Sequence, residues 1–242
     1  MLSTLDLTAG YRTDVPIVNG VTVEFPTSGV FLVIGPNGAG KSTFLGSLYG
    51  LTRVFSGDIR LDGRTLVRDA PWRRRALGIG LVPQGRCNFP YMTVRENLRL
   101  GARLAHRGSA TEMLDQLVAR YPRLRERWRV MAGNLSGGEQ QMLEMAMVLA
   151  GQPRVLLVDE PSLGLAPVWR TQVFAELRDL GDDMLVVVVE QNVRSALSVS
   201  DHVLVMQQGA ISFQGSPDSL LADPRLQDAF LGARGRQAAT DE

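Results

Sequence analysis

The chain has 242 residues, of which 45% are hydrophobic and 21% are charged, proportions that suit one globular domain with a sizeable core. Lys and Arg number 26 against 25 for Asp and Glu, so the chain has no large positive charge to attract nucleic acid. Nucleic acid is therefore not expected as a partner. The longest apolar runs are strand-sized, far below the roughly 20 residues that span a bilayer, so no direct membrane insertion is expected.

Short apolar runs alternate with amphipathic stretches in the first part of the chain, as expected of strands joined by helices. The run before Asp62-Gly63 is expected to be an antiparallel strand, because it ends in a turn signal. The predicted elements are strands at Val21–Phe25, Val30–Ile34, Gly57–Leu61 and Ile79–Val82 and a helix at Lys41–Tyr49.

The pattern becomes helical from about Thr93 to Arg129. Two capping boxes fall in this block, Thr93 with Glu96 and Ser109 with Glu112. A helical insert within an α/β domain, at about residues 88–150, is the economical interpretation.

The sheet pattern then returns and continues almost to the end of the chain. The sequence predicts helices at about Gly138–Ala150 and Pro167–Leu180, strands at Val155–Val158, Met184–Val189, Val203–Met206 and Ile211–Phe213, and a short terminal helical region. The predicted fold is α/β, with a mostly parallel sheet core, an antiparallel β part and the helical insert. One domain is expected at residues 1–232, followed by a flexible tail at 233–242.

A phosphate-binding loop follows the apolar strand at Val30–Ile34 and precedes a helix pattern, the context that this motif requires. Its glycines let successive amides face one point, Lys41 would neutralise outer phosphates, and Ser42 would offer a hydroxyl to Mg²⁺. Lys41 is also the only lysine of the chain, although arginine is abundant, which indicates a site that needs a slim cation. The candidate nucleotide-binding residues here are Gly35, Pro36, Asn37, Gly38, Ala39, Gly40, Lys41, Ser42 and Thr43.

An acid pair follows the apolar strand Val155–Val158. The carboxyl end of this strand would deliver Asp159 and Glu160 beside the phosphate loop. Asp159 is a candidate ligand of Mg²⁺, and Glu160 is a candidate base for the attacking water.

A second glycine-containing helix start precedes the acid pair by about 20 residues. Ser136 and Glu139 again have the spacing of a capping box, and two glycines between them would expose backbone amides. The candidate nucleotide-binding residues of this segment are Leu135, Ser136, Gly137, Gly138 and Glu139.

The order and spacing of these three motifs resemble the nucleotide-binding domain of ABC transporters, a P-loop NTPase, over roughly residues 1–232. The resemblance implies an ATPase that uses ATP and Mg²⁺ and drives transmembrane permease subunits. It also implies a head-to-tail dimer, in which one ATP lies between one chain's phosphate loop and its partner's Ser136 segment. By the same resemblance, Tyr11 would stack on adenine, and Gln84 would link Mg²⁺ to the membrane partner.

Further segments are similar to the subgroup that takes up branched-chain amino acids. They are Pro83–Arg86, Asn88–Leu98, Asp159–Pro167, Val189–Asn192 and Ala229–Gly232. Importers of urea or short-chain amides resemble these segments equally, so the sequence leaves the substrate open. The direction of transport rests on the resemblance alone.

Two residues depart from the general ABC pattern. Gln191 stands where most members have a switch histidine, and Ala166 stands where most have an aspartate. An amide donates a hydrogen bond but carries no titratable charge, so Gln191 is a candidate catalytic residue of altered character, beside Glu160 and Lys41. The subgroup pairs two different ATPase chains, so a heterodimer is expected, and a homodimer stays open. A soluble ABC-type regulator without a transporter is the alternative from another functional class.

Two remaining features have plainer interpretations. The arginines at 73–75 and in the series from Arg120 to Arg129 are predicted to form a solvated face, because acids intervene between them. A lone cysteine, Cys87, and the absence of a secretory signal in the first six residues favour the cytoplasm. With a membrane partner, the expected place is the inner face of the cell membrane, as a peripheral subunit.

Overall fold

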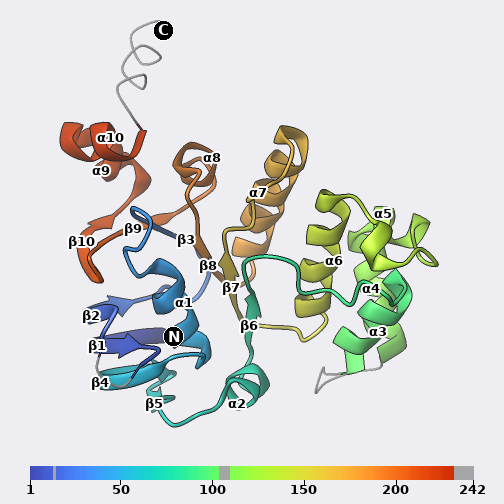
Figure 1. Ribbon diagram of the computed structural model, residues 1–242, viewed down its shortest axis with the longest axis horizontal. Helices are drawn as coiled ribbons and strands as arrows, with labels where there is room; N and C mark the ends of the chain where they lie inside the picture. The colour runs from blue at the N-terminus through green and yellow to red at the C-terminus, as the bar shows by residue number, and fades with distance from the viewer. Residues whose placement is uncertain (13–14, 104–109, 232–242) are drawn as a thin grey trace, which may run out of the picture.

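The computed structural model describes residues 1–12, 15–103 and 110–231 (Figure 1). It confirms the predicted α/β class, with two sheets and with helices on both faces of the larger one. The strands are β1 (Leu2–Gly10), β2 (Val18–Glu24), β3 (Gly29–Ile34), β4 (Arg53–Leu61), β5 (Arg64–Thr65), β6 (Ile79–Val82), β7 (Val155–Asp159), β8 (Leu185–Val189), β9 (His202–Gln207) and β10 (Ala210–Gly215). The helices are α1 (Lys41–Tyr49), α2 (Pro71–Ala76), α3 (Val94–Arg103), α4 (Ala110–Arg120), α5 (Pro122–Glu126), α6 (Gly137–Leu149), α7 (Pro167–Gly181), α8 (Val193–Leu197), α9 (Pro217–Ala222) and α10 (Pro224–Leu231), with a 3₁₀ turn at Ala132–Asn134. The tail predicted at 233–242 lies outside the described residues.

The larger sheet has the strand order β10-β9-β3-β8-β7-β6. Strands β9, β3, β8, β7 and β6 run parallel, and β10 pairs antiparallel with β9. Alternate residues enter two cores: Val186 and Val188 join the core that contains the apolar face of α7, whereas Val187 and Val189 join the core that contains that of α1. Burial of both faces explains the unbroken apolar runs. Because the strands are parallel, the carboxyl ends of β3, β6, β7 and β8 meet at one edge.

The smaller sheet is antiparallel, in the order β2-β1-β4-β5, as predicted for the segment before Asp62. Strand β1 has no counterpart among the predicted elements. The pairing of β1 shifts register between Leu5 and Thr8, and Asp6 has a positive φ of 47°. This bulge leaves Leu5 and Asp6 both exposed and breaks the period-two pattern by which a strand is recognised.

The helical insert contains α3, α4, α5 and α6. The capping box at Thr93 is confirmed, because the Thr93 N–H donates to Glu96 Oε2 (2.8 Å) and the Glu96 N–H donates to Thr93 Oγ1 (3.3 Å). The second predicted box includes Ser109, which lies outside the described residues. After α4, only Tyr121 precedes Pro122, which begins α5, since proline is tolerated in the first turn of a helix but not in its interior. None of the helices in the described ranges combines the length and the apolar character needed to cross a membrane.

The predicted solvated face is wrong for Arg74. This side chain is 1% exposed, and its guanidinium donates to four carbonyl oxygens that end α1 and precede α2. The acceptors are Ser47 O (2.6 Å), Leu48 O (3.0 Å), Leu66 O (2.7 Å) and Asp69 O (3.0 Å). Burial lowers the pKa of Arg74 to about 10. Arg74 therefore satisfies carbonyl oxygens at the C-terminal end of α1. Nothing in the run of arginines at 73–75 distinguishes this buried residue from its neighbours.

The contact between α4 and α7 includes a partly buried carboxylate, Glu176, whose side chain is 15% exposed and whose Oε1 lies 3.6 Å from Arg120 Nε. Burial raises the pKa of Glu176 from 4.5 to about 7, and Arg120 opposes the rise. Between these values the folded chain binds more protons than the unfolded chain. The free energy of unfolding should therefore fall as pH rises from 4.5 to 7, by about 3 kcal/mol at most.

A Glu176→Gln variant should lose this pH dependence, because its side chain does not titrate. Urea unfolding of both chains at pH 5 and pH 8 measures the effect. The variant Glu126→Gln, at an exposed carboxylate of α5, should keep the wild-type dependence. Parallel pH profiles of wild type and Glu176→Gln would contradict the prediction.

Candidate functional site

The loop between β3 and α1 forms a backbone cradle at the carboxyl edge of the sheet. A Cβ on Gly35 would lie 2.2 Å from Met206 O on the neighbouring β9, so only glycine allows the loop to pass this close. Gly40 has a left-handed φ of 95° and begins α1, whose first amides have no partner within the helix. The segment therefore presents N–H groups and the positive end of the helix dipole toward one point, which suits a phosphate.

Lys41 lies at the centre of this cradle and is 5% exposed. Its Nζ donates to Gly35 O (2.9 Å) and Pro36 O (3.1 Å). Burial lowers the pKa of Lys41, and the nearby carboxylates of Glu160, Asp159 and Glu190 oppose this. The cation is therefore held between the loop and the ends of two neighbouring strands.

Ser42 and Asp159 meet across the edge of the sheet, as the two motifs predicted. Ser42 Oγ donates to Asp159 Oδ1 at 3.0 Å, and burial raises the pKa of Asp159. A hydroxyl and a carboxylate in direct contact are hard oxygen ligands of the kind that Mg²⁺ takes. The pair therefore fits a divalent cation held together with a phosphate.

Glu160, 8% exposed, accepts hydrogen bonds from two glutamine amides. Gln84 Nε2 donates to one carboxylate oxygen (2.7 Å), and Gln191 Nε2 donates to the other (2.5 Å). The backbone of Glu160 has a φ of 48°, a conformation that costs a non-glycine residue of order 1 kcal/mol. Its N–H donates to Val189 O at 2.8 Å. The structure thus brings together the ends of β6, β7 and β8 around the carboxylate of Glu160, a residue with a strained backbone.

A second carboxylate of this edge, Glu190, was not among the predicted site residues. It is 2% exposed and accepts from the N–H groups of Gln191 (2.9 Å), Asn192 (3.0 Å) and Ser162 (3.3 Å). It therefore fixes the turn that carries Gln191 to the segment after Glu160. Its position at the end of β8, beside β7, was the available signal.

The comparisons with known proteins agree with this geometry. Residues 18–163 match the family described as ABC transporter. The chain belongs to the ABC transporter family. With the fold and the phosphate loop in place, it is an ATP-binding subunit of this family and an ATPase.

Two relatives are similar over nearly the whole chain. The high-affinity branched-chain amino acid transport ATP-binding protein BraG of Pseudomonas aeruginosa is 38% identical, over 96% of this chain and 100% of BraG. The probable branched-chain amino acid transport ATP-binding protein LivF of Archaeoglobus fulgidus is 36% identical, over 96% and 99%.

Solved structures share the fold. A nucleotide-free ATP-binding cassette has a TM-score of 0.83 at 24% identity, over 95% of this chain and 98% of its own. The ADP conformation of an ATP-binding cassette has a TM-score of 0.83 at 25% identity, over 96% and 98%.

The segment Leu135–Glu139, called the signature segment below, begins α6, on the other side of the sheet from α1 (Figure 1). Ser136 and Glu139 form the predicted capping box, and Glu139 also pairs with Arg123 and Arg127 at 3.1 Å each. Leu135 is buried, and Ser136 and Gly137 are exposed. The structure therefore does not bring this segment to the phosphate loop of its own chain.

Gly138 packs directly against Trp169 of α7. A Cβ at Gly138 would lie 2.1 Å from the indole ring, whereas a Cβ at Gly137 would meet only Leu165, at 3.8 Å. Gly138→Ala should lower the free energy of unfolding by about 2 kcal/mol, because the ring must move. The matched variant Gly137→Ala should be neutral or stabilising, by up to about 1 kcal/mol. Urea unfolding of the two variants checks this; equal stabilities would contradict it.

Tyr11 follows β1 and is 60% exposed. A Cβ on the preceding Gly10 would lie 3.5 Å from Ile17 N, and a Cβ on Gly40 would lie 3.0 Å from Ile17 O. Tyr11 thus leaves the sheet close to the loop segment that borders the phosphate cradle. Its exposed ring leaves a face free for a planar ligand.

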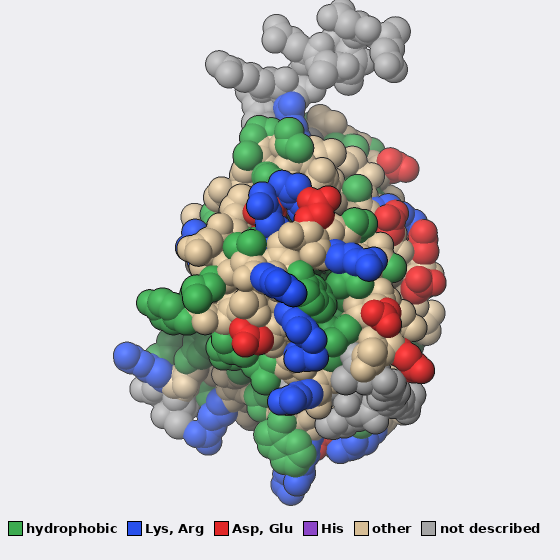
Figure 2. Space-filling view, turned by 90° about the vertical axis from the view of Figure 1, so that its right-hand side faces the viewer, with side chains coloured by type: hydrophobic (Ala, Val, Ile, Leu, Met, Phe, Trp, Pro, Cys, Tyr) green, Lys and Arg blue, Asp and Glu red, His purple; other side chains and the backbone are tan. Residues whose placement is uncertain are grey.

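Figure 2 shows the side of the molecule on which the helical insert lies, and basic side chains there alternate with hydrophobic ones. Apart from the pair with Glu139, Arg123 Nη1 lies 2.6 Å from Glu126. Arg95, Arg99 and Arg103 border a hollow beside Trp128. These arginines therefore belong to a mixed surface in which some of the charges are paired.

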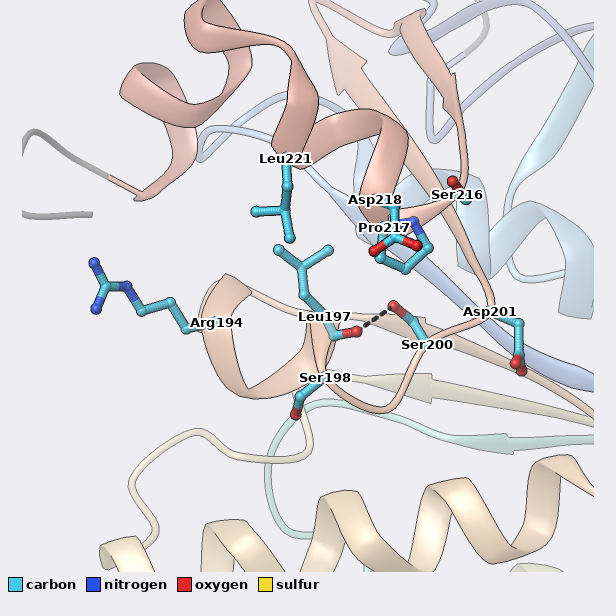
Figure 3. A pocket seen from close by; sticks show the side chains of 9 residues that line it. All are labelled: Arg194, Leu197, Ser198, Ser200, Asp201, Ser216, Pro217, Asp218 and Leu221. Carbon is cyan, nitrogen blue, oxygen red and sulfur yellow. Dashed lines mark hydrogen bonds between the residues drawn. The ribbon is translucent and has the colours of Figure 1, made fainter. Parts of the chain in front are cut away.

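A pocket of about 560 Å³ lies between α8 and α9 (Figure 3). Leu197 and Leu221 face one another across it, and Arg194 extends from its rim (Figure 3). Ser200 Oγ donates to Leu197 O at 3.1 Å. None of the candidate nucleotide-binding residues lines this pocket, so it is separate from the site at the edge of the sheet.

Proposed function

We propose that this chain binds ATP with Mg²⁺ and hydrolyses it to power the import of branched-chain amino acids. The supporting observation is the convergence of Lys41, the Ser42–Asp159 pair and the doubly hydrogen-bonded Glu160 at one edge of the sheet. Such an edge holds a triphosphate and its cation within reach of a base.

Each candidate residue has a separate role in this proposal. The amides of Gly35–Thr43 and Lys41 bind the phosphates, and Tyr11 stacks on the adenine. Ser42, Gln84 and Asp159 hold Mg²⁺, which supplies positive charge to the phosphate oxygens. Glu160 orients the attacking water and accepts its proton, and Gln191 holds Glu160 in place.

We further propose that the site is completed by residues 135–139 of a second ATPase chain. The supporting observation is that this segment begins a helix on the other side of the sheet from α1, with Ser136 and Gly137 exposed. A different chain is the expected partner, because Gln191 and Ala166 both depart from the general pattern. Ala166 is the N-cap of α7 and provides no side-chain cap, so an aspartate contact is missing there.

The permease subunits are proposed to dock beside the loop of Gln84. A pocket of about 230 Å³ lies between this loop, α2, α3 and α6. Its lining is mainly apolar and includes Pro83, Phe89, Leu100 and Met147. A docked permease would place the chain at the inner face of the cell membrane, in the cytoplasm and without insertion.

The substrate assignment follows the names of BraG and LivF. Urea or short-chain amides are the second candidate, and a soluble regulatory ATPase is the third. The test is to purify the chain with its permease and partner ATPase subunits in vesicles, and to measure uptake and Mg-ATPase with leucine or urea. Leucine-dependent uptake supports the proposal; urea-dependent uptake, or full activity without any membrane subunit, overturns it.

A Gln191→His variant should raise ATP turnover in the assembled complex, because an imidazolium beside the terminal phosphate would stabilise charge that a neutral amide cannot. The increase should be largest below about pH 6.5, where histidine is protonated. Steady-state ATPase rates at pH 6 and pH 8 check this. Gln116→His, on the exposed surface of α4, is the control. Unchanged turnover in Gln191→His would show that the amide of Gln191 does not limit the rate of ATP hydrolysis.

A further inference from the structure

Glu144 is a buried carboxylate of α6 that none of the nucleotide-site motifs includes. It is 3% exposed and lies two turns along the helix from the signature residues that begin α6. Among the described residues, it forms no ion pair. A buried carboxylate without a cation needs several donors, so its partners indicate what it holds.

Among the residues that the structure describes, the hydrogen-bond donors to Glu144 belong to the loop between β6 and α3. One oxygen, Oε1, accepts from Cys87 N (2.9 Å), Asn88 N (3.3 Å) and Asn88 Nδ2 (2.7 Å). This part of the loop belongs to neither a helix nor a strand, so its amides lack the partners that regular structure would supply. Glu144 provides those partners.

The same loop begins with Gln84, whose amide donates to Glu160. Gln84, Gly85, Arg86 and Cys87 are all exposed, so side-chain packing does little to fix their positions. The contact with Glu144 begins three residues after Gln84, and there the loop meets a buried side chain. Glu144 thereby connects the signature helix of the chain to the residue that touches the candidate base.

We propose that Glu144 is a positioning residue, which fixes the β6–α3 loop to α6 and so sets where Gln84 meets Glu160. The inference rests on the proposed function, in which Gln84 and Glu160 act on ATP. Loss of the Glu144 acceptor should misplace Gln84 without disturbing the phosphate cradle. A displacement of about 1 Å at such a site reduces turnover strongly, while ground-state binding is largely kept.

The test compares three variants of the full chain, assembled with its partner subunits. Glu144→Ala removes the acceptor. Glu144→Gln keeps an oxygen at the position of Oε1. Leu143→Ala, at the neighbouring core position of α6, destabilises the same helix without removing a polar contact to the loop. The measurements are kcat, KM for Mg-ATP, and hydrogen exchange at the amides of residues 85–89.

Glu144→Ala should lower kcat about tenfold or more, leave KM within about twofold, and accelerate exchange at residues 85–89. Glu144→Gln should restore both kcat and protection, and Leu143→Ala should change neither selectively. Unchanged kcat and exchange in Glu144→Ala would overturn the proposal, as would an equal loss in Leu143→Ala. If the wild-type complex itself hydrolyses no ATP, the proposed function fails, whereas the exchange measurement still decides whether Glu144 holds the loop.

Discussion

Glu160→Gln should reduce ATP hydrolysis by about a hundredfold or more, because the neutral amide cannot accept a proton from the attacking water. In the structure, two amide nitrogens donate to Glu160, from Gln84 and Gln191. A glutamine at position 160 keeps one acceptor oxygen and turns an NH₂ group toward the other amide. The variant should therefore fold and bind Mg-ATP while failing in the chemical step.

The measurement is the steady-state ATPase rate of the chain assembled with its partner subunits, together with the melting temperature at saturating Mg-ATP. Glu24→Gln, at an exposed carboxylate that ends β2, is the control and should match the wild type in both. If Glu160→Gln hydrolyses ATP at the wild-type rate, Glu160 is not the base. Equal, negligible turnover in the wild type and the variant would instead indicate a binding module.

Lys41→Arg should raise the dissociation constant for Mg-ATP about a hundredfold, nearly as much as Lys41→Ala. Lys41 is 5% exposed, and its Nζ lies within 3.1 Å of two loop carbonyls, so the broad guanidinium does not fit. Loss of charge-assisted hydrogen bonds to phosphate costs about 2 to 3 kcal/mol of binding free energy, which corresponds to about a hundredfold change in the dissociation constant.

Calorimetric titration with Mg-ATP measures the change, and the loss of ligand-induced thermal stabilisation provides a second readout. Arg53→Lys, at an exposed position that begins β4, exchanges the same residue types elsewhere and should leave binding unaltered. Wild-type affinity in Lys41→Arg would show that a cation of any shape suffices, and wild-type affinity in Lys41→Ala would show that none is needed.

Much of the sheet and the Ser42–Asp159 contact could be predicted from the sequence, because each rests on local signals. Apolar strands that end in polar residues give the order of the elements, and parallel pairing brings those ends to one edge. The phosphate loop predicts its own backbone from its glycines. The dimer, by contrast, follows from resemblance, and within one chain it is supported only by the separation of α6 from α1.

The parts that sequence reasoning missed depend on contacts between distant segments. The bulge at Asp6 in β1 hides a nine-residue strand, because its side chains change faces midway. Glu190 follows an apolar strand, which places it at the edge of the sheet, but only the fold reveals that Glu190 and Glu144 each accept hydrogen bonds from several loop amides. The amides that bracket Glu160 come from positions 84 and 191, and no local spacing joins them.

The burial of Lys41 in the phosphate cradle also allows selective chemical labelling of the nucleotide site. Lysine occurs once in the sequence, so Lys41 is the one side chain that an amine-directed reagent would acylate. Lys41 is 5% exposed and lies inside the phosphate cradle. Acylation of position 41, read by peptide mass, would thus report occupancy of the cradle in the unmodified wild-type chain, with no engineered probe.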